Sequence, residues 1–106
     1  FWGLGAAVPV TPFGAWSFDL SEEEARPLLA GCPPDAVLVT HAPPRGHVDQ
    51  SEGGEHLGSV AVREAIERAR PTLAVCGHIH ASWERESTLG PTRILNAGPR
   101  GVEVEV

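Results

Sequence analysis

Two short apolar runs, at 37–40 and 73–76, lie on either side of a helical segment at 60–70, and each run leads into histidine. Apolar runs this continuous are typical of strands buried on both faces of a parallel sheet. A strand, a helix and a second strand within so short a stretch favour a right-handed crossover with parallel pairing. The pattern therefore predicts an α/β fold in which both strands end at the same edge of one sheet.

Three histidines follow these two runs: His41 follows the first, and His78 and His80 follow the second. Open parallel sheets bind ligands beyond the carboxyl ends of their strands. Neighbouring strands lie about 4.8 Å apart, so His41 and His78 could share one metal. In extended backbone His78 and His80 would point the same way with their Cα atoms roughly 6.5–7 Å apart, a spacing that suits two neighbouring metals. We predict a metal site built from His41, His78 and His80.

The other candidate ligands favour a structural interpretation. A histidine met alone is more often a hydrogen-bonded structural residue than a metal ligand. His47 and His56 lie in the loop after the first strand and are assigned to that class. Cys76 lies within an apolar run, so we interpret it as a small buried hydrophobe.

Short elements separated by proline and glycine make up the rest of the chain. Ser21 and Glu24 form a capping box that predicts a helix over 21–30, which Pro27 should kink or shorten. Residues 2–8 favour a strand. Turn residues separate three further segments that we expect to be antiparallel strands, at 82–88, 92–95 and 102–106. Asn96 is assigned to a turn.

The loop at 41–57 is long for a compact domain, and loops of this length are often functional. Arg45 is a candidate phosphate contact. Ser59 opens the following helix and is either a second phosphate contact, through exposed amides, or simply a helix cap. The acidic residues of the loop are interpreted as solvated surface rather than substrate contacts; they are Asp49, Glu52 and Glu55.

Composition excludes several classes of function. The net charge is −6 and the positive charges are scattered arginines, so there is no nucleic-acid footprint. No apolar stretch is long enough for a membrane span. Two cysteines without framework spacing favour the reducing cytoplasm. The chain contains no methionine, and we expect 106 residues that start at Phe1 to be part of a longer protein. An acidic chain that handles phosphate needs a local cation, which a metal could supply.

Three motifs together resemble the C-terminal half of the calcineurin-like metallophosphoesterases. They are Thr40-His41-Ala42-Pro43-Pro44, Gly77-His78-Ile79-His80 and Asn96-Ala97-Gly98-Pro99. Gly58-Ser59 and the Thr11-Pro12-Phe13 region also resemble small prokaryotic members of the family. The resemblance covers most of the chain from residue 36 onward. It implies that residues 1–106 are the C-terminal portion of one domain, a four-layered β-sandwich flanked by helices.

The resemblance also implies a chemistry. In that family the histidines that match His41 and His78 bind one divalent metal, and the histidine that matches His80 binds a second. The metals would be Mn, Zn, Fe or Ni. The implied reaction is hydrolysis of a small phosphate monoester or diester by water that the two metals activate.

The family's N-terminal motifs are absent from this chain, namely Asp-x-His, Gly-Asp-x-x-Asp and Gly-Asn-His. Without their carboxylates we expect the segment alone to bind metal weakly and to be inactive, and we assign it no catalytic residue. Two alternatives stay open. One is a non-catalytic metal- or ligand-binding module, and the other is a segment whose site a second chain completes.

Overall fold

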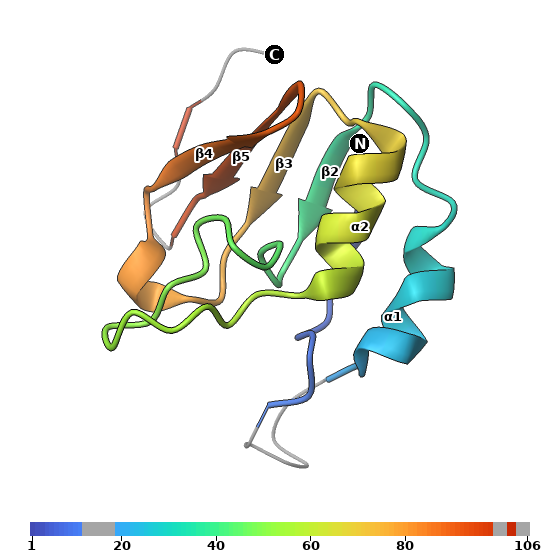
Figure 1. Cartoon of the computed structure of the whole chain (residues 1–106). Helices are drawn as coiled ribbons and strands as arrows, with labels where there is room; N and C mark the ends of the chain where they lie inside the picture. Colours follow the sequence, from blue (N-terminus) through green and yellow to red (C-terminus); the bar gives the residue numbers. More distant parts are fainter. Residues whose placement is uncertain (12–18, 99–101, 104–106) are drawn as a thin grey trace.

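The computed structural model describes residues 1–11, 19–98 and 102–103. Within these residues one five-stranded sheet carries two helices on one face, and its strand order is β1-β2-β3-β5-β4 (Figure 1). The strands are β1 (Trp2–Leu4), β2 (Val37–Thr40), β3 (Leu73–Cys76), β4 (Glu86–Leu89) and β5 (Thr92–Asn96); the helices are α1 (Glu22–Leu29), α2 (Val60–Ala69) and the short 3₁₀ turn η2 (His80–Ser82). The predicted α/β class is confirmed.

The predicted parallel unit is present as β2, α2 and β3. Val37 pairs with Leu73, and the register continues along both strands. Leu38, Ala74 and Ile94 lie side by side on three neighbouring strands and are buried. The apolar face of α2 packs against them; its buried residues are Ala61, Val62, Ala65, Ile66 and Ala69. Full burial of side chains such as Leu38 contributes about 1.5–3 kcal/mol each, which holds the crossover together.

The first helix begins as the sequence predicts. Ser21 Oγ accepts a hydrogen bond from the Glu24 amide at 3.1 Å, and Glu24 Oε1 accepts one from the Ser21 amide at 3.1 Å. This reciprocal pair satisfies two amides that a helix start leaves without partners. Pro27 lies inside α1 on its exposed side, and Leu29 is buried against the core.

Two strand predictions need correction, and the predicted antiparallel pairing of a third strand is confirmed on one side only. The segment 80–82 forms η2, so the strand predicted at 82–88 begins at Glu86. The strand predicted at 2–8 ends at Leu4. β5 is antiparallel to β4 but parallel to β3. The turn at 90–91 reverses the chain after β4, and β5 then lies between β4 and β3 in the sheet. Residues 102–103 are not in a strand, and the remainder of the predicted strand 102–106 lies outside the described residues, as do Pro12 and Phe13.

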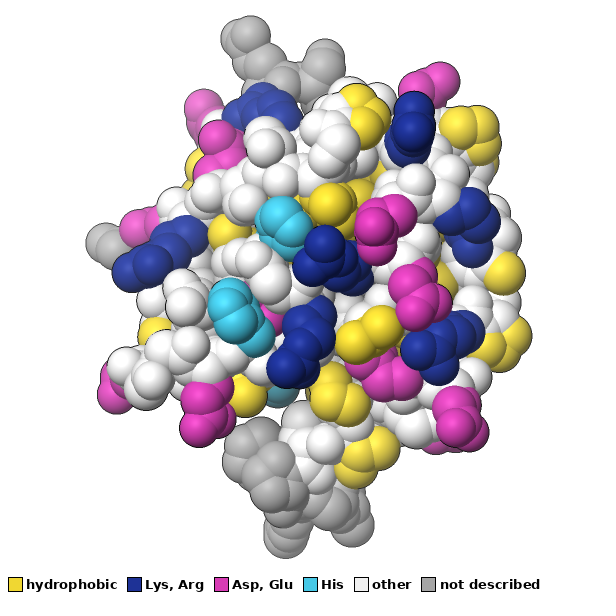
Figure 2. Space-filling model, in the orientation of Figure 1, with side chains coloured by type: hydrophobic (Ala, Val, Ile, Leu, Met, Phe, Trp, Pro, Cys, Tyr) yellow, Lys and Arg dark blue, Asp and Glu magenta, His cyan; other side chains and the backbone are white. Residues whose placement is uncertain are grey.

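The described residues form two layers, one sheet and one layer of helices. On the opposite face of the sheet, Gly3, Val39, Val75 and Leu95 lie side by side, and Val39 is 43% exposed. On the helix-bearing face, arginines are interspersed with acidic side chains (Figure 2). Neither described helix has the length and apolar character needed to cross a membrane.

Glu22 joins the two helices. Its carboxylate accepts hydrogen bonds from Ser59 Oγ and from the amides of Val60 and Ala61 at the start of α2. A carboxylate is favourable there because helix N-termini carry free amides and a positive dipole end.

Glu22→Ala should therefore lower the free energy of unfolding by about 1–2 kcal/mol in a denaturant titration. Glu23→Ala, in the same first turn of α1, is the control, and equal losses in both variants would refute the bridge.

Candidate functional site

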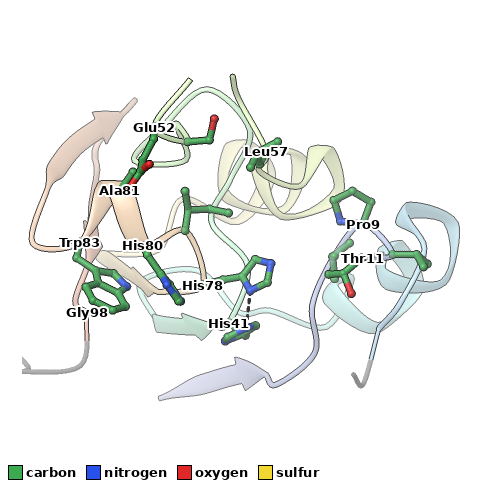
Figure 3. A pocket seen from close by; sticks show the side chains of 14 residues that line it. Pro9, Thr11, His41, Glu52, Leu57, His78, His80, Ala81, Trp83 and Gly98 are labelled. Atoms are coloured by element: carbon green, nitrogen blue, oxygen red, sulfur yellow. Dashed lines mark hydrogen bonds between the residues drawn. The ribbon is translucent and has the colours of Figure 1, made fainter. Parts of the chain in front are cut away.

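The ends of β2 and β3 bring two imidazoles together. His41 Nε2 lies 2.9 Å from His78 Nδ1, and the two ring centroids are 4.6 Å apart (Figure 3). Backbone hydrogen bonds extend the sheet past the strand ends: the His41 amide donates to Leu4 O, and the Gly77 amide donates to His41 O. His41 and His78 thus lie together at one edge of the sheet, as the sequence predicts.

The sequence predicts extended backbone after β3, but the backbone there is not extended. His78 has a φ of +68°, in the left-handed region, and the Ile79 amide donates back to Gly77 O. Histidine occurs in this region more often than most residues, but the conformation still costs on the order of 1–3 kcal/mol. In extended backbone the side chains of His78 and His80 would point the same way, and the predicted spacing of two metals depended on that. The left-handed turn at His78 removes this basis.

The side chain of Asn96 contacts the backbone of this strained turn on both sides of His78. Its side chain is fully buried, and Nδ2 lies 3.2–3.3 Å from the carbonyl oxygens of Val48, Gly77 and Ile79. Two of these carbonyls flank His78, and the third belongs to the long loop. Oδ1 has no hydrogen-bond partner among the described residues. The sequence predicts only a turn at Asn96, because nothing local distinguishes a buried amide from a turn residue.

His80 makes a different ring contact from the close pair. It begins η2, and its ring stacks on Trp83 with centroids 4.4 Å apart and the planes 35° apart. Across the described part of the chain, no group of three or more His, Cys, Asp or Glu side chains is placed to hold a metal ion. The described site therefore offers a pair of imidazoles, with His80 beside it.

The surroundings of His78 disfavour its protonated form. Burial lowers the pKa of His78, and the neighbouring rings of His41 and His80 lower it further, while the carboxylate of Asp19 acts in the opposite direction. A neutral imidazole has a lone pair for a metal. Burial raises the pKa of Cys76 to about 12, so this thiol is protonated and unsuited to metal binding, in agreement with its predicted role as a small buried hydrophobe.

The two nitrogens are hydrogen-bonded to each other, and their spacing also fits a metal ion that would take the place of the proton between them. Imidazole nitrogens bind Zn at about 2.0–2.1 Å. Two nitrogens 2.9 Å apart would then subtend about 90° at the ion, the angle between adjacent octahedral positions. Imidazole suits Zn, Fe, Ni and Cu, whereas Mn prefers oxygen donors. His41 and His78 could thus hold two adjacent positions of one metal, and further donors would have to fill the others.

The two predicted phosphate contacts are not brought to this site. Ser59 is fully buried, its hydroxyl caps α2 through the Val62 amide, and Glu22 occupies the amides that a phosphate would need. Arg45 is exposed, but it is not among the described residues that line the cavity at the histidines. The capping interpretation of Ser59 matches the structure.

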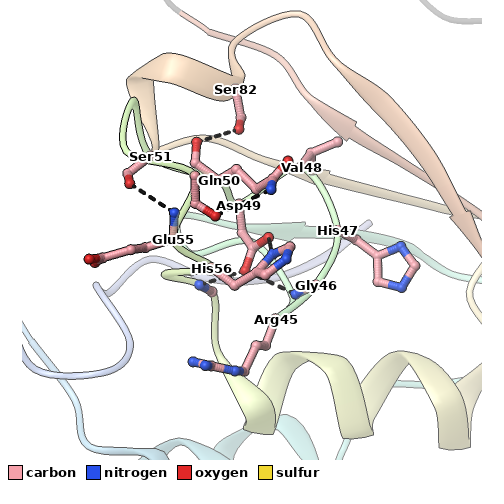
Figure 4. Close-up of polar contacts among 12 residues, drawn as sticks. Arg45, Gly46, His47, Val48, Asp49, Gln50, Ser51, Glu55, His56 and Ser82 are labelled. Carbon is pink, nitrogen blue, oxygen red and sulfur yellow. Dashed lines mark hydrogen bonds and ion pairs between the residues drawn. The ribbon is translucent and has the colours of Figure 1, made fainter.

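The long loop is organised around one buried carboxylate. Asp49 is fully buried and accepts hydrogen bonds from the amides of Gly46 and Gly58, each at 2.9 Å (Figure 4). His56 Nδ1 lies 2.7 Å from Asp49 Oδ1. Burial acts to raise the pKa of Asp49, but the hydrogen bonds from His56, Gly46 and Gly58 outweigh it and lower that pKa. The interpretation of Asp49 as solvated surface was wrong, because local sequence does not show three converging donors.

A cavity of about 940 Å³ opens at the histidine pair (Figure 3). Its lining combines the three histidines with three other polar side chains and a mainly apolar wall. The described residues that line it are Val8, Pro9, Val10, Thr11, His41, Ser51, Glu52, Leu57, His78, Ile79, His80, Ala81, Trp83 and Gly98. A concave, mostly apolar site with a few convergent polar groups is the usual form of a small-molecule pocket.

Two curated relatives resemble the chain over more than half of its length. They are two UPF0046 proteins from Caenorhabditis elegans, each 38% identical, over 61 residues (57% of this chain, 15% of the relative) and over 63 residues (58% and 20%). A probable rhamnogalacturonate lyase C from Emericella nidulans is 42% identical over 52 residues, 47% of this chain and 5% of that protein. The chain thus corresponds to a fifth or less of the length of these relatives. No family model matches it.

The fold also occurs in a solved crystal structure. That structure superimposes with a TM-score of 0.62 at 25% sequence identity, and the match covers 91% of this chain and 39% of the other. Almost the whole chain therefore corresponds to a part of a larger known α/β structure.

Proposed function

We propose that this chain carries the histidine part of the active site of a metal-dependent phosphoesterase of the calcineurin-like type. The observation that carries the proposal is the pair of imidazole nitrogens, 2.9 Å apart, at the ends of two adjacent parallel strands. The Gly-His-Ile-His and Thr-His-Ala-Pro-Pro motifs and the similarity to UPF0046 proteins support it. Residues 1–106 would be the C-terminal portion of one domain, in keeping with the partial match to a larger structure.

In this proposal His41 and His78 hold one divalent metal and His80 holds a second. When bound, the metals would supply Lewis acidity and lower the pKa of a water that attacks phosphorus. The chain's own residues prepare the ligands: Asn96 fixes the backbone on either side of His78, and burial disfavours the protonated form of the His78 imidazole. The substrate would be a small phosphate monoester or diester bound in the cavity beside the pair.

A second candidate is a non-catalytic metal- or ligand-binding module, or a segment that another chain completes. It is favoured because no group of three or more His, Cys, Asp or Glu side chains among the described residues is placed to hold a metal ion. The binding module differs from the enzyme in one observable respect, since a metal would bind to it without accelerating hydrolysis. For either candidate we propose the cytoplasm as the compartment, because Cys32 and Cys76 are both free and buried.

Removal and return of metal test the proposal. The full-length protein is stripped with a chelator and assayed with a phosphate monoester and a phosphodiester, before and after addition of Mn, Zn, Fe or Ni. We expect hydrolysis to disappear with the metal and to return at least about 100-fold with one of them. Hydrolysis that resists chelation would contradict metal chemistry, and metal binding without hydrolysis would favour the binding module.

A further inference from the structure

Exposed apolar side chains line the cavity on more than one side of the histidines. Val10, Leu57 and Trp83 line it, and they are 61%, 42% and 38% exposed. Large apolar side chains exposed together, as opposed to singly, mark a surface that binds something. They come from three separate segments of the chain, so local sequence does not account for their meeting. The fold assembles an apolar wall next to the imidazole pair.

The position of Trp83 is set from two directions. Its ring stacks on His80, with centroids 4.4 Å apart. Gly98 lies against the base of the side chain, where an added Cβ would come within 3.0 Å of Trp83 Cβ and Cγ. Gly98 also has a φ of +70°, which disfavours any other residue there. Trp83 is thus held beside His80 while much of its surface stays open to the cavity (Figure 3).

Charge indicates what kind of group this wall accepts. Among the described residues that line the cavity, Glu52 is the charged side chain apart from the histidines, and there is no arginine. A second phosphate or carboxylate would meet Glu52, and no arginine among the described lining residues offsets that repulsion. An uncharged flat group would instead bury the exposed surface of Trp83. The lining favours a substrate with one anionic end.

We propose that the substrate is a phosphate ester whose organic part is an uncharged aromatic group, packed against Trp83 while its phosphate lies at His41 and His78. This inference rests on the proposed phosphoesterase function. Trp83 is then a specificity-determining residue, and Gly98 a positioning residue that makes room for it.

The test compares 2-phenylethyl phosphate with ethyl phosphate, because both release primary alcohols and differ by the aromatic ring. The full-length, metal-loaded protein is assayed for kcat/KM on each, alongside Trp83→Ala and Trp83→Phe. Leu28→Ala is the matched control, since Leu28 is 53% exposed on α1 and does not line the cavity. We expect the native protein to prefer the phenylethyl ester at least about tenfold. Trp83→Ala should abolish that preference, whereas Trp83→Phe and Leu28→Ala should keep most of it.

The outcomes separate this inference from the function on which it rests. Equal rates for both esters, or a preference that survives Trp83→Ala, would overturn the aromatic assignment and leave the phosphoesterase intact. If neither ester is hydrolysed, calorimetric titration of the two esters decides. Tighter binding of the phenylethyl ester that requires Trp83 would support the pocket in a binding module, and equal or absent binding would overturn it.

Discussion

His41→Ala and His78→Ala should each reduce both metal affinity and phosphoester hydrolysis by at least about 100-fold. Each substitution leaves one imidazole of a pair whose nitrogens are 2.9 Å apart, and a single imidazole cannot hold two adjacent positions of a metal. Both rings lie at the cavity surface, His41 exposed and His78 half-buried, so their loss should leave the folded state intact. Calorimetric metal titration and the ester assay measure the two effects separately.

His47→Ala is the matched control for this prediction. It also removes an imidazole, but His47 does not line the cavity, and its Nδ1 lies 2.8 Å from Ser87 Oγ on β4. It should leave metal affinity and activity within about twofold of the native values. If all three alanine variants lost affinity to the same extent, the assignment of the metal to His41 and His78 would be wrong.

Asp49→Ala should cause the largest loss of stability, about 3 kcal/mol in the free energy of unfolding. The substitution leaves the amides of Gly46 and Gly58 and the ring of His56 without their shared acceptor. Buried donors that lose a charged acceptor bear a large desolvation cost. Glu55→Ala is the control, because Glu55 lies in the same loop with its side chain exposed. Chemical denaturation measures both variants, and a loss below about 1 kcal/mol for Asp49→Ala would contradict a structural role.

The same carboxylate should make stability depend on acid. The pKa of Asp49 is lowered in the folded protein, so its contribution is present above the unfolded value of about 3.9 and is lost as the pH falls through the lower folded value. Below about pH 4 the native protein should therefore lose stability more steeply than Asp49→Asn, which has no carboxyl proton to gain there. Parallel slopes for the two proteins between pH 5 and 2 would count against a hydrogen-bonded, ionised Asp49.

The parallel unit and the histidine pair were predictable because each depends on a short-range pattern. The runs at 37–39 and 73–76 are apolar throughout, and the helix between them repeats its apolar positions at helical spacing. Parallel strands that are neighbours end at one sheet edge, so His41 and His78 had to converge. The capping box at Ser21 is equally local, and it is present.

The features that were missed depend on contacts between distant segments. The left-handed backbone at His78 is held in part by Asn96, which lies on a different strand. Asp49 is buried by donors from both ends of its loop, although its neighbours in sequence are typical of solvated surface. β5 pairs with β3, and its residues Ile94 and Leu95 are buried on opposite faces of the sheet. A hairpin pattern in the sequence does not reveal that β5 also pairs with β3. Sequence spacing therefore predicted that His41 and His78 lie close together, but not the backbone conformation that sets the direction of the His78 side chain.

The most direct test of the central claim is a zinc titration of the protein with ¹⁵N-labelled histidine, followed through the ring-nitrogen resonances. The account predicts that the signals of His41 Nε2 and His78 Nδ1 shift together with one affinity, because a single ion binds both atoms. Those of His47 and His56 should stay unchanged at the same zinc concentration. Shifts at His47 or His56 while His41 and His78 stay unchanged would contradict the account.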